Sequence, residues 1–170
     1  MFYLANTKTI MILNLIGILF EKGKNNFNNI HVEFPKMISR YASTYKLEKF
    51  VHLSALGIEN AKDSIYAQSK LKGEEEILNN FDKAVIARPS IVYSVDDNFT
   101  TQLMTLLGLL PIFPIYYNGK TKFRPIFCSD FTNSFTKIII DDIKEYIIDF
   151  AGPEEMSFKE ILEKLLSLIE

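Results

Sequence analysis

The stretch FVHLSALGIENAKDSIYAQSKLKGEEEILNNFDKAVIARPSIVY, residues 50–93, predicts a strand, a helix and a second strand in succession. Residues 50–53 form a short apolar run, which is typical of a buried strand. Residues 66–79 have apolar side chains at helical spacing, with Glu and Lys between them. Residues 84–87 are apolar again, and Arg88-Pro89 ends the run. Two buried strands joined by a helix predict parallel pairing with a crossover.

The flanking sequence continues this alternation in both directions. On the N-terminal side, residues 9–19 form a continuous Ile-rich run that predicts a buried strand, and residues 30–45 have the apolar spacing of a helix. On the C-terminal side we expect a helix, a strand and a helix within 99–143, a last strand at 146–151 and a final helix at 158–169. The pattern predicts an α/β fold with a parallel sheet.

Composition and charge exclude several classes of protein. The 170 residues suffice for a compact core, and 48% hydrophobic with 24% charged residues is ordinary for a globular protein. The net charge is −2 and no basic run stands out, so we expect no nucleic-acid partner. The single cysteine, Cys128, cannot form an internal disulfide, which favours a reducing, cytoplasmic location. The two histidines, His31 and His52, exclude a His-rich site, so we expect no metal.

Two apolar runs need comparison with membrane segments. Residues 11–20 are too short to cross a bilayer as a helix, and no small-residue cleavage site follows them. Residues 103–117 are interrupted by Pro111 and Pro114. We therefore predict no transmembrane segment and no signal peptide.

Tyr66 and Lys70 are the residues of this chain best suited to chemistry. Residues four apart share one face of a helix, so both side chains point the same way. A tyrosine has a pKa of about 10, and a nearby ammonium lowers that pKa by favouring the phenolate. Tyr66 is therefore a candidate general acid/base for a carbonyl–alcohol redox step, with Lys70 also donating to a ribose. Chance produces many such pairs, but this one lies between two predicted strand ends, where open parallel sheets bind ligands.

Other noticeable residues have simpler interpretations. The acidic run Glu74-Glu75-Glu76 predicts a solvated helix face, because charged residues are rarely fully buried. His52 alternates with Val51 and Leu53, and we expect it to be a packed or half-exposed strand residue rather than a catalytic base.

Six stretches together resemble a known family. They are NLIGILFEKGKNNFNNIHVE (14–33), FVHLSALGIE (50–59), SIYAQSKLKGEEEI (64–77), IARPSIVYS (86–94), KFRPIFCSDF (122–131) and FAGPEEMSFKEIL (150–162). In this order they resemble the extended and atypical short-chain dehydrogenases/reductases, within the NAD-dependent epimerase/dehydratase superfamily. The most similar branch contains the NAD(P)H-binding accessory subunit of respiratory complex I and its bacterial relatives.

The resemblance implies an incomplete architecture. It implies an incomplete Rossmann-like, doubly wound parallel sheet that starts at the family's fourth strand, with part of a small C-terminal substrate domain. Residues 1–95 would be the C-terminal half of the NAD(P)-binding domain. Residues 96–170 would be a partial substrate-binding region interleaved with the last strands and helices. The family's Gly-rich phosphate-binding turn has no counterpart here, since Gly17 is the first glycine. We therefore expect a chain truncated at the N-terminus and at the C-terminus.

The resemblance also implies roles for individual residues. The catalytic residues it implies are Tyr66, Lys70 and Ser54, although the family's catalytic hydroxyl aligns with either Ser54 or Ala55. The cofactor is NAD or NADP. The residues implied to contact it are Leu15, Ile16 and Gly17 in the turn after the first strand, His31 in the following helix, and Pro89 and Ser90 beside the nicotinamide. Without a Gly-rich turn for the phosphates, we expect the isolated chain to bind NAD(P) weakly.

Three functions remain open at this level. The first is an NAD(P)-binding accessory subunit, with respiratory complex I subunits as partners and peripheral association with the inner membrane. The second is an active oxidoreductase or epimerase acting on a nucleotide sugar or a similar alcohol, for which Tyr66 is essential. The third is an inactive fragment of a split gene.

Overall fold

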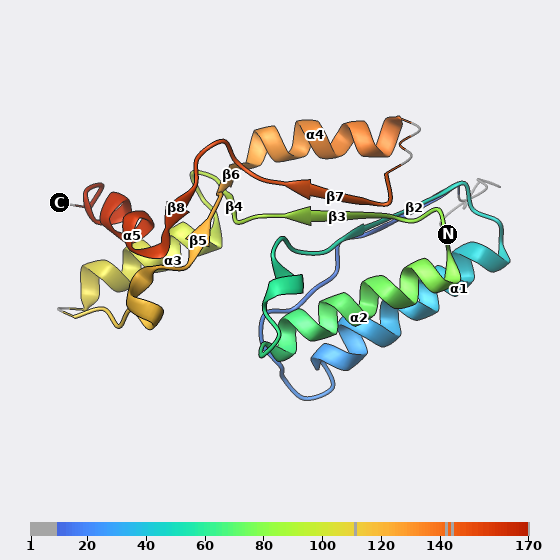
Figure 1. Ribbon diagram of the computed structural model, residues 1–170, viewed down its shortest axis with the longest axis horizontal. Coiled ribbons are helices and arrows are strands. Elements are labelled where there is room, and N and C mark those ends of the chain that lie inside the picture. Colours follow the sequence, from blue (N-terminus) through green and yellow to red (C-terminus); the bar gives the residue numbers. More distant parts are fainter. Residues whose placement is uncertain (1–9, 111, 142, 144, 170) are drawn as a thin grey trace, which may run out of the picture. The chain divides into compact units, whose positions relative to one another are not determined.

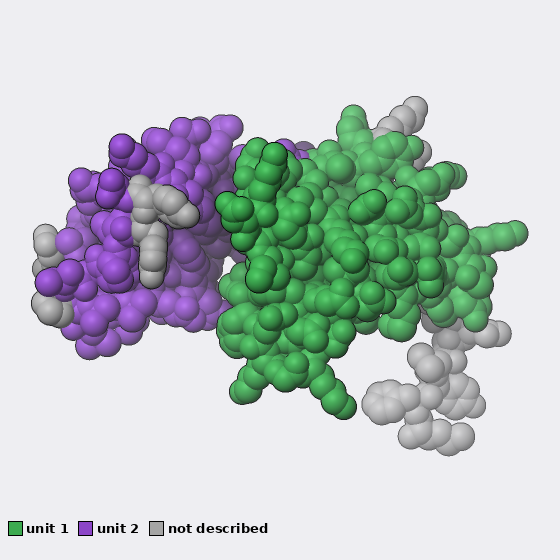
Figure 2. All heavy atoms as spheres, turned by 60° about the horizontal axis from the view of Figure 1, so that its bottom comes forward, with its two compact units in different colours: residues 1–88, 138–148 green, residues 89–137, 149–170 purple. Residues whose placement is uncertain are grey.

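The computed structural model describes residues 10–110, 112–141, 143 and 145–169. The chain divides into two compact units, residues 1–88 with 138–148 and residues 89–137 with 149–170 (Figure 2). The elements in chain order are β1 (Met11–Asn14), η1 (Asn28–Glu33), α1 (Phe34–Thr44), β2 (Lys49–Leu53), η2 (Ile58–Asn60), α2 (Ile65–Asn80), β3 (Val85–Pro89), β4 (Val92–Tyr93), α3 (Asn98–Leu109), η3 (Tyr116–Gly119), β5 (Lys122–Phe123), β6 (Ile126–Phe127), α4 (Cys128–Ile140), β7 (Ile147–Phe150), β8 (Met156–Ser157) and α5 (Phe158–Leu166).

The main sheet has the order β1-β2-β3-β7 (Figure 1). β1 pairs with β2 in parallel, and β2 pairs with β3 in parallel. The parallel α/β sheet predicted from the sequence is therefore confirmed, with β2 and β3 close to the predicted 50–53 and 84–87.

The first strand is shorter than predicted. We expected residues 9–19 to be extended, but β1 ends at Asn14, where its pairing with β2 ends at His52. Leu15, Ile16 and Leu19 follow as an exposed segment outside the sheet. Apolar composition alone could not locate this boundary, because a strand extends only as far as its neighbour provides hydrogen bonds. Thr9 lies outside the described residues.

The strand β2 is covered on both of its faces. Phe50, Val51 and His52 are each at most 1% exposed, although consecutive residues of a strand point to opposite sides. Burial on both faces explains why β2 reads as a continuous run rather than an alternating one. The core on one face joins sheet residues to both long helices of the first unit: Ala42, Leu47, Phe50, Ile77, Phe81, Ala84 and Ile86.

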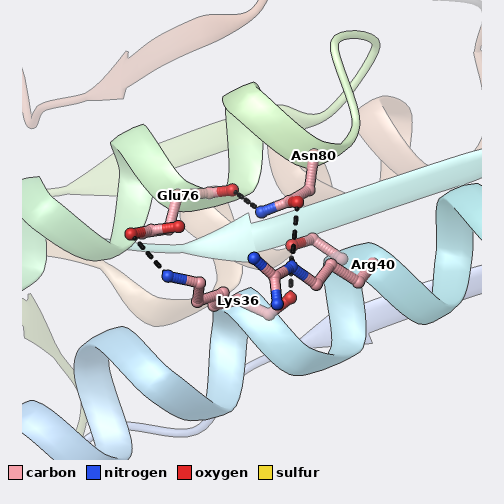
Figure 3. Close-up of polar contacts among 5 residues, drawn as sticks. Lys36, Arg40, Glu76 and Asn80 are labelled. Atoms are coloured by element: carbon pink, nitrogen blue, oxygen red, sulfur yellow. Dashed lines mark hydrogen bonds and ion pairs between the residues drawn. The ribbon is translucent and has the colours of Figure 1, made fainter.

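α1 and α2 lie side by side, and polar side chains connect them through an ion pair and a hydrogen bond. Lys36 on α1 forms an ion pair with Glu76 on α2 at 3.0 Å. The Nε of Arg40 donates to the Asn80 carbonyl oxygen Oδ1 at 3.2 Å (Figure 3). Partly exposed pairs of this kind contribute little free energy, about 0–1 kcal/mol each. Packing therefore holds the two helices together, and these contacts fix their register.

The second unit contains two small sheets and the last helices. β4 pairs with β6 in parallel, and β5 pairs with β8 antiparallel. Ser157 and Glu160 form a capping box at the start of α5, the helix expected at 158–169. α3 begins at an Asp97 cap and buries none of its described side chains. Among the described residues, no helix combines the length and apolar character needed to cross a membrane; Pro111 is not described.

One glycine sets how closely α2 approaches η1. A Cβ built on Gly73 would lie 1.9 Å from the backbone carbonyl oxygen of His31. No side chain fits in that space, so the helix meets the π-helical turn directly, backbone against backbone. The π-helical turn is a rare, wide form often found at functional sites.

We predict that Gly73→Ala destabilises the protein by about 1–3 kcal/mol or more, because the added methyl group forces α2 away from η1. Gly108→Ala in α3 is the matched control. That helical glycine has open space around its Cβ position, so alanine there should be neutral or stabilise by about 0.4–1 kcal/mol. Urea denaturation of both variants measures the difference. Equal stability of the two would contradict the close approach.

Candidate functional site

The side chains of the first unit that are suited to chemistry meet beyond the carboxyl end of β2. Ser64 caps the N-terminus of α2, and its side chain accepts a hydrogen bond from the backbone N–H of Ala67. This helix carries Tyr66 and Lys70 one turn apart. The Nζ of Lys70 donates to the carbonyl oxygen of Leu53, the last residue of β2, at 3.1 Å. Lys70 is 5% exposed.

Gly17 borders the Lys70 ammonium. A Cβ built on Gly17 would lie 3.3 Å from Nζ of Lys70 and 3.7 Å from Nε2 of His31. Any larger residue would press against the lysine head group, so glycine lets this segment lie close to Lys70. Leu15 and Ile16, on the same segment, are 53% and 50% exposed.

His31 holds the Gly17 segment against α2. Its Nε2 accepts a hydrogen bond from the backbone N–H of Ile18 at 3.0 Å. Its Nδ1 lies 2.8 Å from the Ser69 hydroxyl, whose own proton is donated to the Tyr66 carbonyl oxygen. Nδ1 must therefore carry the ring proton, and Nε2 must be unprotonated. The ring is neutral because burial, and secondly the charge of Lys70, lower the pKa of His31 to about 4.

His52 is a second neutral histidine, in the opposite tautomer. The backbone N–H of Ile16 donates to Oδ1 of Asn14, which orients the amide so that its Nδ2 donates to Nδ1 of His52 at 2.9 Å. Nε2 of His52 therefore carries the proton. Burial, followed by the charge of Lys70, lowers the pKa of His52 to about 3. His52 is packed, as predicted.

Two buried polar atoms on β2 and just after it have no hydrogen-bond partner among the described residues. They are Nε2 of His52 and the hydroxyl oxygen of Ser54. The two residues are two apart along the chain, so their side chains extend to the same side of the sheet. Ser54 is 6% exposed, and its backbone N–H donates to Ala87. An unpartnered buried polar group costs about 1–3 kcal/mol, so each of these atoms is a candidate to bind a ligand.

Tyr66 is packed among rings, and this changes its predicted chemistry. Its ring meets His31 edge-to-face at 5.4 Å and Phe27 at 5.8 Å. Burial raises the pKa of Tyr66. We expected the Lys70 ammonium to lower that pKa, and this expectation is wrong, because loss of hydration outweighs the charge one helical turn away.

Lys70 itself titrates near neutral pH. Burial lowers its pKa to about 8, and the Glu74 carboxylate opposes that shift. The ammonium is therefore the group of this cluster whose charge changes closest to physiological pH.

The remaining predicted residues lie in the second unit. Pro89 ends β3, and the backbone N–H of Ser90 donates to the Phe150 carbonyl oxygen at 2.8 Å. Their predicted contact with a cofactor stays a prediction.

Sequence reasoning missed several residues of the site. Asn14 and Ser69 each fix a histidine tautomer, and neither carries a local pattern that distinguishes it. Glu74 was expected on a solvated face, but it is 3% exposed and forms an ion pair with Arg88. Two features of the sequence could have indicated this burial. Glu74 lies two steps of four residues after Tyr66, a spacing that keeps residues near one helix face, and Arg88 ends the next strand.

We predict that protonation of the two histidines destabilises the fold in acid. Both folded pKa values lie below 6.5, so the unfolded chain binds protons first, and stability present above pH 6.5 is lost as the pH falls toward 4 and then 3. Each histidine withdraws at most about 1.4 kcal/mol per pH unit. Urea denaturation between about pH 7 and pH 5 measures this slope, and His52→Phe should reduce it. An unchanged slope in that variant would contradict the neutral burial of His52.

Comparison with known proteins gives a consistent result. No family model matches the chain. The mouse mitochondrial NADH dehydrogenase [ubiquinone] 1 alpha subcomplex subunit 9 is 26% identical over 144 residues, which cover 84% of this chain and 38% of the mouse protein. The mitochondrial NADH-ubiquinone oxidoreductase 40 kDa subunit of Neurospora crassa is 23% identical, over 95% of this chain and 44% of the relative. The chain thus spans about two fifths of the length of these curated relatives.

Solved structures agree on the fold. The UDP-glucuronic acid 4-epimerase of Bacillus cereus, in complex with UDP-glucuronic acid and NAD, matches with a TM-score of 0.69 at 19% identity, over 94% of this chain and 59% of the epimerase. A dTDP-4-dehydrorhamnose reductase from Clostridium acetobutylicum matches with a TM-score of 0.69 at 16% identity, over 82% of this chain and 53% of the reductase. The chain therefore has the Rossmann-like fold of epimerase/dehydratase-type short-chain dehydrogenases/reductases, and in sequence it resembles the alpha subcomplex subunit 9, or 40 kDa subunit, of NADH-ubiquinone oxidoreductase.

Proposed function

We propose that this chain binds the nicotinamide–ribose end of NAD or NADP and belongs to an accessory subunit of a respiratory NADH:quinone oxidoreductase. In this function the nucleotide is held without turnover. The carrying observation is the packing of Tyr66 against the rings of His31 and Phe27, where burial raises its pKa. A tyrosine that stays protonated and packed among rings suits a binding wall better than a general base, whose pKa should approach the working pH.

The site offers groups that match a ribose and a nicotinamide amide. Lys70 has three N–H donors and gives one to Leu53, which leaves donors for ribose hydroxyls. Gly17 places no side chain against the lysine head group. The unpartnered hydroxyl of Ser54 is a donor and acceptor at the same strand end. These groups match the hydrogen-bonding needs of the cofactor, and Pro89 and Ser90 remain proposed contacts.

The proposed partner and location come from sequence similarity. The relatives are named as mitochondrial subunits of NADH-ubiquinone oxidoreductase. We infer that this chain associates with the corresponding respiratory enzyme and lies peripherally at the membrane that holds it.

A second candidate is an active oxidoreductase or epimerase acting on a nucleotide sugar. Two observations favour it: Tyr66 and Lys70 share α2 one turn apart, and structures of the same fold include an epimerase in complex with UDP-glucuronic acid and NAD. This alternative requires the Tyr66 hydroxyl for hydride transfer. Nucleotide-dependent turnover that Tyr66→Phe abolishes would establish it in place of the accessory function.

We predict that Lys70→Met weakens nucleotide binding about tenfold or more, since a charge-assisted hydrogen bond contributes about 1.5–3 kcal/mol. Ligand-observed NMR titration with nicotinamide mononucleotide and with NADH, up to millimolar concentration, measures the affinity. Lys72→Met is the matched control, because Lys72 is exposed on the same helix. Tyr66→Phe should bind as the unmodified chain does. Equal loss in the Lys72 and Lys70 variants would place the binding elsewhere.

The partner is tested separately. Affinity purification of the tagged chain from detergent-solubilised membranes of its own cells should recover NADH:quinone oxidoreductase subunits at constant ratio. A chain recovered free of those subunits would contradict the accessory function without bearing on nucleotide binding.

A further inference from the structure

The buried face of α2 carries two opposite charges that do not pair with each other. Lys70 and Glu74 are one turn apart and are 5% and 3% exposed. At that spacing a lysine and a glutamate commonly form an ion pair. Here the Nζ of Lys70 donates to the Leu53 carbonyl oxygen instead.

Arg88 accounts for this arrangement. Its Nε donates to Oε1 of Glu74 at 3.0 Å, and its Nη2 donates to Oε2 at 2.5 Å. Both oxygens of the carboxylate are thereby engaged by one planar guanidinium, the bidentate geometry that arginine forms better than lysine. Arg88 also lies 3.6 Å from a Glu59 carboxylate oxygen. The guanidinium is therefore held between two carboxylates at the end of β3.

We propose that Arg88 is a positioning residue that holds the Glu74 carboxylate away from Lys70, so that the Lys70 Nζ keeps its hydrogen-bond donors for Leu53 and for a bound ribose. The role in ribose binding rests on the proposed function. The arrangement itself, called the clamp below, is the bidentate contact of Arg88 with Glu74 beside Lys70. The residues of the clamp come from two elements, α2 and β3, and fix the strand end relative to the helix.

The titratable groups around Lys70 make Glu74 the relevant charge. His31 from η1 and His52 from β2 face the ammonium, and both are neutral above about pH 5, with pKa values of about 4 and about 3. Tyr66, on the same helix, is neutral because burial raises its pKa. Glu74 forms an ion pair with Arg88 and favours the charged form of Lys70.

The clamp predicts the direction in which the Lys70 pKa changes when Arg88 or Glu74 is replaced. If Arg88 releases Glu74, the carboxylate turns to Lys70, forms a direct ion pair and raises the lysine pKa. If Glu74 is neutralised, burial of Lys70 goes unopposed and the lysine pKa falls. Because the Glu74 charge acts on Lys70 in either case, the test of Arg88 is how its substitution changes the Lys70 pKa with Glu74 present and with Glu74 replaced.

The experiment is a titration of Lys70 in the folded full chain, without nucleotide, by NMR of lysine labelled with ¹³C at Cε. Arg88→Gln should raise the pKa of Lys70 by about one unit or more, the effect of an opposite charge brought into contact. Glu74→Gln should lower it. Glu75→Gln is the matched control, because Glu75 is exposed on the same helix, and should leave it unchanged.

The double variant Arg88→Gln/Glu74→Gln decides whether Arg88 acts through Glu74. The rise caused by Arg88→Gln should be smaller in the Glu74→Gln background than in the unmodified chain. An equal rise in both backgrounds, or no rise with Glu74 present, would overturn the proposal. If circular dichroism shows that Arg88→Gln does not fold, Arg88→Lys provides the test, since it keeps the charge and loses the bidentate contact; it should raise the pKa, and an unchanged value would overturn the clamp.

Nucleotide affinity distinguishes this inference from the proposed function. In the unmodified chain, bound nicotinamide mononucleotide should reduce the pH-dependent change of the Lys70 NMR signal. Arg88→Lys should weaken the binding of this nucleotide several-fold. Shifts of the Lys70 pKa in the expected directions with no nucleotide binding would support the clamp and contradict the proposed function.

Discussion

The direct contact between α2 and η1 at Gly73 is the constraint on which the site depends. Because the helix lies against the His31 carbonyl oxygen without an intervening side chain, the His31 ring reaches Ser69 and Tyr66 on one side and Ile18 on the other. The segment after β1 is thereby fixed above Lys70. A larger residue at position 73 would separate these groups together, since all of them are positioned through the same contact.

Burial of a lysine beside two histidines would be unfavourable if the histidines were charged, because like charges repel. Both rings are neutral here, and their tautomers are fixed in opposite senses. His31 accepts a hydrogen bond from a backbone N–H, and His52 accepts one from the Asn14 amide. Each ring therefore carries one proton and no charge beside the ammonium. Glu74 supplies a compensating charge at a distance, and Arg88 keeps it there. Lys70 is thereby a cation with unused donors at the end of a parallel strand, where ligands commonly bind.

This electrostatic arrangement supports the proposed binding function rather than proton transfer. A redox enzyme of this fold requires a tyrosine that can exchange a proton at neutral pH, whereas burial moves the pKa of Tyr66 in the opposite direction. Lys70, with a pKa of about 8, is charged at neutral pH and suits hydrogen bonding to a ribose.

The sequence by itself determined the alternation of elements and the position of Tyr66 and Lys70 on one helix. Continuous apolar runs in the strands, helical spacing of apolar residues and the Arg88-Pro89 end of β3 are local signals, and local signals are readable from one chain. It also predicted the residues of the site that recur in a family pattern, including Gly17, His31 and Ser54. Only the tertiary structure decided the end of β1 at Asn14, the burial of Glu74, the tautomers of both histidines and the direction of the Tyr66 pKa shift. Each of these depends on groups distant in sequence, such as Asn14 with His52 or Glu74 with Arg88, because hydration and hydrogen bonding are set by whatever side chains the fold brings together.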